Sequence, residues 1–193
     1  MDVFTVRSSH TGITLIELLL VVAITSVIAT TIAPSFSNLN KRISQKAATA
    51  NLVSALNLAR NTAIVEQTTV TVCPIDTMVS RCTNDWNLPI MVFRDKHRIG
   101  ELVDTDYAIR IVQPPRGGRW VVRSGFRNYF RFRSSGWAKE AIGNFLWCPN
   151  DNDTKYSSQV RLNMGGRPTL SVDNDGDGII EDASGNKVTC PSI

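Results

Sequence analysis

Residues 12–34 read GITLIELLLVVAITSVIATTIAP, and this stretch decides how the rest of the chain is interpreted. From Ile13 to Ala33 the only charged side chain is that of Glu17, and Pro34 closes the apolar run. A helix of this length reaches about 30 Å at about 1.5 Å per residue, the thickness of the hydrocarbon core of a bilayer. The sequence therefore predicts an apolar helix that either spans a membrane or is removed as an export signal.

Glu17 fits neither of these interpretations well. In a secretory signal that is removed entirely, residues 1–7 would form the basic region and residues 15–24 the apolar core, which a carboxylate weakens. In an ordinary transmembrane helix, a carboxylate left in lipid costs on the order of a few kcal/mol. A third interpretation, in which Glu17 has a role of its own, is therefore favoured.

That third interpretation comes from a resemblance. Gly12 followed by Ile13-Thr14-Leu15-Ile16-Glu17-Leu18 resembles the class III signal of type IV prepilins, although that family usually has Phe where Ile13 stands. The resemblance implies that a prepilin peptidase cuts between Gly12 and Ile13 and methylates the new amino terminus. It also implies that Glu17 neutralises the terminal amine of a neighbouring subunit in an apolar filament core, where removal of either partner would strand a buried charge.

The segment from Ser35 to Glu66 continues the helix with an amphipathic pattern. Apolar residues recur at three and four positions, the helical period, at Leu39, Ile43, Ala47, Ala50, Val53, Leu56, Ala63 and Ile64. We expect this face to pack on a globular domain, and we expect Pro34 to kink the helix rather than end it.

After Glu66 the pattern changes to short β-branched and aromatic runs, most of them separated by Gly, Pro, Asn or Ser. The predicted strands are residues 68–73, 90–93, 108–112, 120–122, 129–132, 145–148, 160–162 and 169–172. One long helix packed on an antiparallel β-rich domain is an α+β fold. The predicted segments are a leader (1–12), a transmembrane and assembly half-helix (13–34), an amphipathic half-helix (35–66) and a β-rich head (67–193).

Further motifs resemble the GspH/FimT branch of the pilin family. Ala59-Arg60-Asn61-Thr62-Ala63 is similar to the end of that family's amphipathic helix, and Val70-Thr71-Val72-Cys73 is similar to the strand that follows. Trp86 and then Val92-Phe93-Arg94-Asp95 continue the similarity, with Asn87-Leu88-Pro89 where the family commonly has a glycine. The resemblance extends to about residue 95 and implies the pilin fold.

The four cysteines are Cys73, Cys82, Cys148 and Cys190. An even number in a chain with an export signal predicts two disulfides, for which three connectivities exist. We expect Cys73–Cys82, the nearest pair in sequence, and Cys148–Cys190, which would tie the acidic C-terminal region to the body. Four free buried thiols are the alternative, and a zinc site is disfavoured because no Cys-x-x-Cys spacing occurs.

The net charge of +4 is unevenly distributed along the chain. Residues 107–139 carry eight Arg and Lys and no acid, whereas residues 149–193 carry seven acids against four bases. The arginines alternate with aromatic residues, so they either form a solvated face that pairs with a neighbouring subunit or contact DNA phosphates. The DNA-binding candidates are Arg131, Arg133 and Arg167. Some FimT-type minor pilins bind DNA through Gly-Arg-x-Arg, and Gly166-Arg167-Pro168-Thr169 lacks the second arginine, so we expect weak binding at most.

An acidic repeat near the C-terminus is a candidate calcium site. Asp173, Asp175 and Asp177 alternate and are followed by Gly178, as in the first half of an EF-hand loop. The twelfth position would be Ser184 rather than a glutamate, with Glu181 and Asp182 out of register. A solvated acidic turn is therefore favoured, and no cofactor is expected, although Ca²⁺ stays open.

No nucleophile–base pair is evident, and His97 lies in a polar stretch, so we expect no enzyme activity. The resemblance implies a minor pilin that helps initiate or cap a type IV pilus. The alternatives are a GspH-like pseudopilin of a type II secretion system and a DNA-binding minor pilin in DNA uptake. The implied partners are major and minor pilins, prepilin peptidase and the inner membrane, which the chain would cross once with its head in the periplasm.

Overall fold

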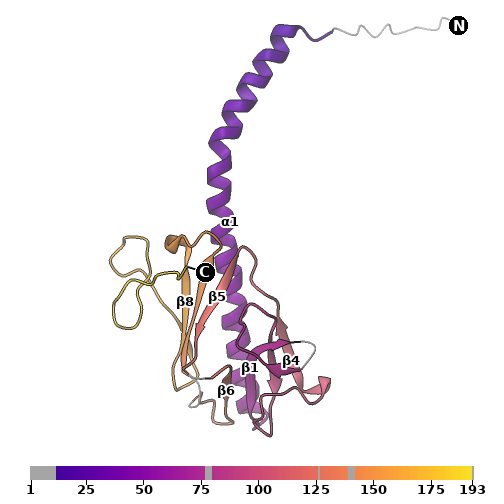
Figure 1. Ribbon diagram of the computed structural model, residues 1–193, viewed down its shortest axis with the longest axis vertical. Coiled ribbons are helices and arrows are strands. Elements are labelled where there is room, and N and C mark those ends of the chain that lie inside the picture. The colour runs from indigo at the N-terminus through magenta and orange to yellow at the C-terminus, as the bar shows by residue number, and fades with distance from the viewer. Residues whose placement is uncertain (1–11, 77–79, 126, 139–141, 193) are drawn as a thin grey trace, which may run out of the picture. The chain divides into compact units, whose positions relative to one another are not determined.

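The computed structural model describes residues 12–76, 80–125, 127–138 and 142–192, with side chains except at residues 31–35. Residues 1–11 of the predicted leader lie outside this description. The chain divides into two compact units, with the boundary between Leu39 and Asn40. Helix α1 (Leu15–Val65) contributes its N-terminal half to the first unit and its C-terminal half to the second (Figure 1).

Helix α1 begins directly after Thr14. The Thr14 hydroxyl accepts a hydrogen bond from the Glu17 amide at 3.3 Å, and the Thr14 carbonyl accepts one from the Leu18 amide at 3.2 Å. A threonine in this position satisfies an amide that the first helical turn would otherwise leave unpaired. The helix then continues past Pro34, which confirms that this proline does not end it. The kink predicted at Pro34 stays a prediction.

The C-terminal half of α1 packs against the rest of the second unit through small side chains. Its buried residues are Ala48, Thr49, Leu52, Ala55, Leu56, Ala59 and Ala63. The predicted face was wrong in the first turns of this half, because Ile43, Ala47 and Ala50 are exposed. Leu56 and Ala63 are buried as predicted, and Val53 packs at the edge of the core.

Two antiparallel sheets complete the second unit. The first has the order β2-β1-β3-β4, with β6 also paired to β1. Its strands are β1 (Val70–Asp76), β2 (Arg81–Cys82), β3 (Ile90–Arg94), β4 (Ala108–Val112) and β6 (Phe130–Phe132). The second has the order β5-β7-β8-β9, with strands β5 (Gly118–Arg123), β7 (Gly143–Pro149), β8 (Ser158–Leu162) and β9 (Pro168–Leu170). Each predicted strand is confirmed, β4 with the predicted bounds and the others with at least one shifted end. Strand β2 and the 3₁₀ turns η1 (Thr105–Tyr107) and η2 (Thr154–Tyr156) were not predicted.

One core joins the C-terminal half of α1 to both sheets. Within this core, Trp86 contacts one ring of each sheet, and these two rings also contact each other. The Trp86 ring contacts Phe130 of β6 edge-on at a centroid distance of 5.5 Å, and Phe145 of β7 at 5.2 Å. Edge-to-face pairs of this kind contribute about 0.5–1.5 kcal/mol beyond the burial of their area. Trp86, carried on a loop, therefore helps to hold the two sheets together.

Both predicted disulfides are confirmed. Cys73 of β1 is bonded to Cys82 of β2, and Cys148 of β7 is bonded to Cys190. The second bond adjoins a small apolar cluster that includes Leu146, Val188 and Ile180. The acidic C-terminal region is thus fastened to the second sheet both covalently and by apolar packing.

Candidate assembly surface and charged clusters

The first unit exposes an almost continuous apolar surface. Its exposed large apolar side chains are Ile13, Leu15, Ile16, Leu18, Leu19, Leu20, Val21, Val22, Ile24, Val27 and Ile28. Soluble monomers rarely expose a contiguous apolar patch larger than a few hundred Å², and such patches mark interaction surfaces. We call residues 13–30 the apolar segment. It is the candidate assembly surface of this chain.

The hydroxyl groups of the apolar segment are bonded within the helix itself. Thr25 donates to the Val21 carbonyl at 2.9 Å, Ser26 to the Ala23 carbonyl at 2.8 Å and Thr30 to the Val27 carbonyl at 2.9 Å. A hydroxyl that bonds the preceding turn in this way does not need water as a partner. These side chains therefore enter apolar surroundings without an unpaired donor.

Glu17 is the one charged residue of the apolar segment, and it lies in the first turn of α1. An acidic side chain is favoured there because the helix N-terminus carries a partial positive charge. Thr14 and Glu17 have the spacing of a capping box, a local signal that our sequence interpretation did not use. Gly12 and Ile13 precede the helix and are exposed, so the predicted cleavage bond lies just outside the capped turn.

The membrane span predicted from the sequence is not confirmed. Among the described residues, no helix combines the length and the hydropathy that crossing a bilayer requires.

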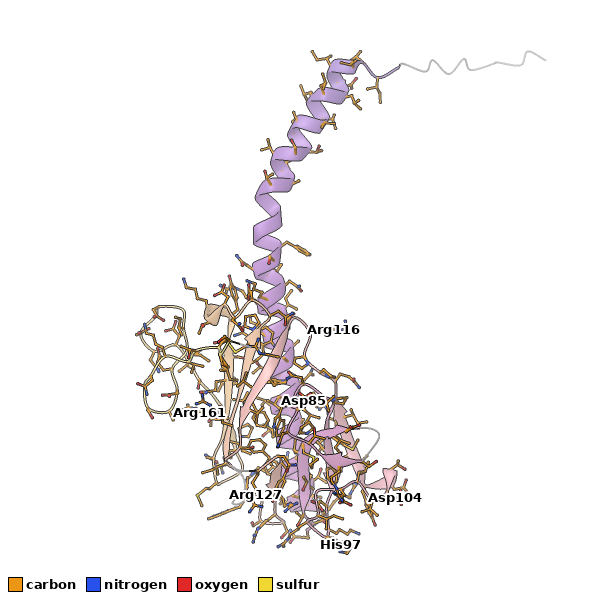
Figure 2. The ribbon with its side chains drawn as sticks, viewed as in Figure 1. Asp85, His97, Asp104, Arg116, Arg127 and Arg161 are labelled. Carbon is orange, nitrogen blue, oxygen red and sulfur yellow. A yellow bond between two sulfur atoms is a disulfide. The ribbon has the colours of Figure 1, made fainter. Side chains whose placement is uncertain are left out.

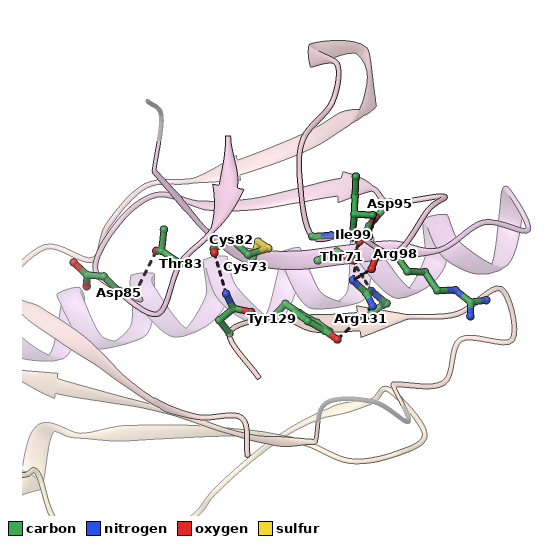
Figure 3. The surroundings of a disulfide bond; sticks show 12 residues. Thr71, Cys73, Cys82, Thr83, Asp85, Asp95, Arg98, Ile99, Tyr129 and Arg131 are labelled. Atoms are coloured by element: carbon green, nitrogen blue, oxygen red, sulfur yellow. Dashed lines mark hydrogen bonds and ion pairs between the residues drawn. A yellow bond between two sulfur atoms is a disulfide. The ribbon is translucent and has the colours of Figure 1, made fainter. Parts of the chain in front are cut away.

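Arg131 was one of the three candidate DNA contacts, and its burial rules it out as one. Its side chain is buried, and its guanidinium lies 2.9 Å from the Asp95 carboxylate, 3.1 Å from the Thr71 hydroxyl and 3.0 Å from the Arg98 carbonyl (Figure 3). It also stacks on the Tyr129 ring, 4.2 Å from the centroid. All these partners belong to the first sheet and its loops, so Arg131 has a structural role.

Asp95 is the other centre of this buried network. Its carboxylate accepts hydrogen bonds from the Thr71 hydroxyl at 2.8 Å, the Ile99 amide at 2.9 Å and the Gly100 amide at 3.1 Å. A buried charge is tolerated when it is both paired and hydrogen-bonded. The network fixes the turn after β3 against β1 and β6.

The other two DNA-binding candidates lie on neighbouring loops. Arg133 is half-buried in the turn after β6, and Arg167 is exposed just before β9. The two loops meet through glycines, since a Cβ on Gly166, whose φ is +70°, would collide with the Gly136 carbonyl. The structure thus brings Arg133 and Arg167 into the same region, while their contact with DNA stays a prediction.

The remaining arginines of the basic stretch do not share one face. Arg110 is on β4 of the first sheet and donates to the Ser54 hydroxyl at 2.8 Å. Arg119 is on β5 of the second sheet and donates to the Pro191 carbonyl at 2.6 Å. Arg116 and Arg127 lie at opposite ends of the second unit (Figure 2). The dense basic stretch in the sequence is therefore dispersed in space.

The acidic repeat is brought together with a residue that the sequence interpretation set aside. Asp173, Asp175, Asp177 and Glu181 each provide a carboxylate oxygen, and these four oxygens lie within 4.8 Å of one another. Gly178 has a φ of +89°, which lets the chain turn between the third aspartate and Glu181. His97, by contrast, is exposed as predicted (Figure 2).

Comparison with known protein families identifies the chain. The model of the family described as "Type II transport protein GspH" matches residues 48–166, and the "Prokaryotic N-terminal methylation motif" matches residues 7–33. The chain belongs to the GspH family. It is accordingly a minor pilin or pseudopilin of the type IV and GspH kind.

One solved structure is similar to this chain at the level of the fold. The crystal structure of the type IV minor pilin FimU of Pseudomonas aeruginosa strain PAO1, space group P21, is similar with a TM-score of 0.53 at 15% identity, covering 69% of this chain and 92% of FimU. A second crystal form of FimU, space group P65, gives a TM-score of 0.47 at 12% identity, covering 66% and 92%. A comparison with the curated proteins finds no match.

The motifs that resemble the GspH/FimT branch are explained by the core of this GspH family member. Val70 and Val72 are buried on β1, Trp86 joins the two sheets, and Asp95 holds Arg131. Where the family commonly has glycine, the side-chain oxygen of Asn87 accepts a hydrogen bond from the Trp120 backbone amide at 3.0 Å. The backbone amide of Asn87 donates to the Asp85 carboxylate at 3.0 Å. Asparagine and aspartate thus form this turn through side-chain hydrogen bonds.

Proposed function

We propose that this chain is a minor pilin that helps initiate or cap a type IV pilus after prepilin peptidase removes residues 1–12. The observation that carries the proposal is the apolar segment, whose exposed surface contains a single carboxylate in its first, threonine-capped turn. Its role is structural, and its partners are the apolar segments of other major and minor pilins. Before assembly, the same segment holds the chain in the inner membrane, with the head in the periplasm.

The physical argument rests on Glu17. Cleavage after Gly12 leaves a positively charged amine at Ile13, just before the helical turn that contains Glu17. When apolar segments pack together, this amine on one subunit and Glu17 on the next neutralise each other. A buried charge that is left without its partner costs about 3–5 kcal/mol, so the pair also fixes the axial position of one subunit against the other.

The second candidate is a GspH-like pseudopilin of a type II secretion system. The family description favours it, because it names a type II transport protein. The match to FimU favours the pilus at the level of the fold. Deleting the gene and measuring surface pili and secreted enzymes in the same strain distinguishes the two roles.

Processing tests the first step. Mass spectrometry of the mature chain should find N-methylated Ile13 as its first residue, and Gly12→Leu should accumulate as the uncleaved precursor. Thr11→Leu, which keeps the glycine in front of the cleaved bond, is the control and should be processed normally. A mature N-terminus near residue 33 would contradict the pilin interpretation.

Assembly tests the role of Glu17. Glu17→Ala should still enter the membrane fraction, but its amount in sheared fibres should fall at least about tenfold, since more than about 1.4 kcal/mol of pairing energy is removed. Asp106→Asn, which removes an exposed acid of η1 in the second unit, is the matched control. Equal incorporation of the Glu17→Ala chain would show that this carboxylate does not position the subunit.

A further inference from the structure

The acidic cluster of Asp173, Asp175, Asp177 and Glu181 has the dimensions of a calcium site. Ca²⁺ binds oxygens at about 2.3–2.6 Å, so two ligands on opposite sides of one ion lie about 4.8 Å apart. The four carboxylate oxygens lie within 4.8 Å of one another. One ion can therefore contact all four without a large rearrangement, and backbone carbonyls or water would complete the roughly 6–8 ligands that Ca²⁺ takes.

Glu181 provides an observation that is independent of the spacing of the four carboxylates. The residue is buried, with 6% of its surface exposed, and its Oε1 atom has no hydrogen-bond partner within the described residues. Its other oxygen, Oε2, accepts from the Asn174 amide at 2.8 Å and from the Asn174 side chain at 3.1 Å. A buried carboxylate oxygen without a donor is costly, and a cation in the cluster would remove this cost.

The backbone holds Glu181 in this position. Its amide donates to the Val172 carbonyl at 3.1 Å, and it forms an antiparallel bridge with Lys187. Directly after Lys187, Val188 packs in the apolar cluster next to the Cys148–Cys190 disulfide. The backbone of Glu181 is therefore held in place by these contacts, whereas the three aspartates lie on an exposed loop.

Lys187 is the cation that the cluster already has. Its ammonium contacts Asp177 and lies 3.4 Å from Asp175. The four carboxylates together still outweigh this single positive charge. Lys187 would therefore compete with a metal ion for Asp175 and Asp177. It does not provide a hydrogen-bond donor to the buried Oε1 atom of Glu181.

We propose that Asp173, Asp175, Asp177 and Glu181 bind one Ca²⁺, with the carboxylate of Glu181, at the ninth position from Asp173, taking the place of the glutamate that an EF-hand loop has at its twelfth. The ion draws the exposed loop of the three aspartates onto the fixed position of Glu181. Binding displaces the Lys187 ammonium from Asp175 and Asp177.

Titration calorimetry of the full chain in detergent, stripped with chelator and titrated with CaCl₂, tests this. One Ca²⁺ should bind with a Kd of about 0.1–1 mM, the range of extracellular calcium modules, and at least about tenfold more tightly than Mg²⁺, which demands a smaller octahedral site. Glu181→Gln keeps the shape but removes the charge, and should raise the Kd at least about tenfold. Asp106→Asn, outside the cluster, should leave the Kd unchanged.

A second variant, Lys187→Gln, distinguishes an effect on Ca²⁺ binding from a general disruption of the loop. It removes the competing cation and should lower the Kd for Ca²⁺, whereas a variant that only disrupted the loop would raise it. Saturable binding that weakens in Glu181→Gln and tightens in Lys187→Gln supports the site. No saturable heat up to about 10 mM CaCl₂, about ten times the expected Kd, would overturn it, as would an unchanged Kd in Glu181→Gln.

Discussion

At the scale of single residues, Arg131 shows how a side chain that has two interpretations in the sequence has only one in the structure. It lies between Tyr129 and Arg133 in a basic, aromatic stretch, which is also the composition of a nucleic-acid-binding surface. In the fold it is buried against Asp95, which is 36 positions away in sequence. The pairing partner of a charge depends on strand order, and strand order is not a local property of the sequence.

Replacing one partner of this pair should be costly. Arg131→Ala should lower the free energy of unfolding by about 3–5 kcal/mol, because the Asp95 charge is left buried without its partner. Arg123→Ala, at an exposed position of β5, should change it by less than about 0.5 kcal/mol. Denaturant unfolding of the two variants and the parent chain measures the difference.

The double variant Asp95→Asn with Arg131→Met provides the control for this interpretation. Because it removes both charges, it should recover part of the stability that is missing from Arg131→Ala. If Arg131→Ala and Arg123→Ala unfolded at the same denaturant concentration, the buried pair would have no structural role.

At the scale of elements, the sequence predicted the long helix and most strands, but not the face that α1 buries. Alanines occur at positions 47, 48, 50, 55, 59 and 63, so several phases of a helical pattern fit them equally well. A shift of one residue rotates the face by about 100°. Whether Ala47 or Ala48 is buried depends on how α1 packs against the two sheets, and the sequence of the helix alone does not determine this packing.

The phase of α1 can be tested by a pair of substitutions. Leu52→Ala should destabilise the chain by about 2–5 kcal/mol, because Leu52 is fully buried in the core. Ile43→Ala should change stability by less than about 0.5 kcal/mol, because Ile43 is exposed. Thermal unfolding of the two variants is the measurement, and a larger destabilisation by Ile43→Ala would restore the face predicted from sequence.

The sequence also predicted both disulfides, and for one of them the arrangement of the strands explains why the prediction was correct. Cys73 lies in β1 and Cys82 in β2, and these consecutive strands pair with each other, so the nearest cysteines in sequence are also near in space. The division of the strands into two sheets was not predicted. Strand β6 pairs with β1, so that Val70 lies opposite Phe132, and no local pattern in either strand specifies that partner.

At the scale of the whole molecule, the burial of Arg131 changes what a DNA-binding experiment can mean. Its replacement would weaken the core, and any decrease in binding would then report unfolding. With Arg131 excluded, a basic surface near it is a hollow lined by Lys96, Arg98 and Arg133, together with polar residues and Glu66. Glu66 is itself paired with Arg94 at 2.6 Å, which lowers the pKa of Glu66.

We expect weak, non-specific attraction of the full chain to DNA in a gel shift, since the arginines are dispersed over two sheets. Any affinity should fall with salt, and Arg98→Ala with Arg133→Ala should reduce the slope by about one unit for each phosphate that is no longer neutralised. Arg116→Ala with Arg127→Ala, which removes the same charge at separate positions, is the control. Micromolar binding abolished by the first pair alone would establish a DNA-binding face.

The Cys148–Cys190 bond, which spans 42 positions, makes a closed covalent ring of the chain between its two sulfurs. The ring contains β8, β9 and the exposed acidic loop. A protease that cuts one peptide bond anywhere within it opens the ring but releases neither piece, because each piece keeps one of the two cysteines. A protease can therefore cut the exposed acidic loop of this protein while the disulfide keeps the two fragments covalently linked.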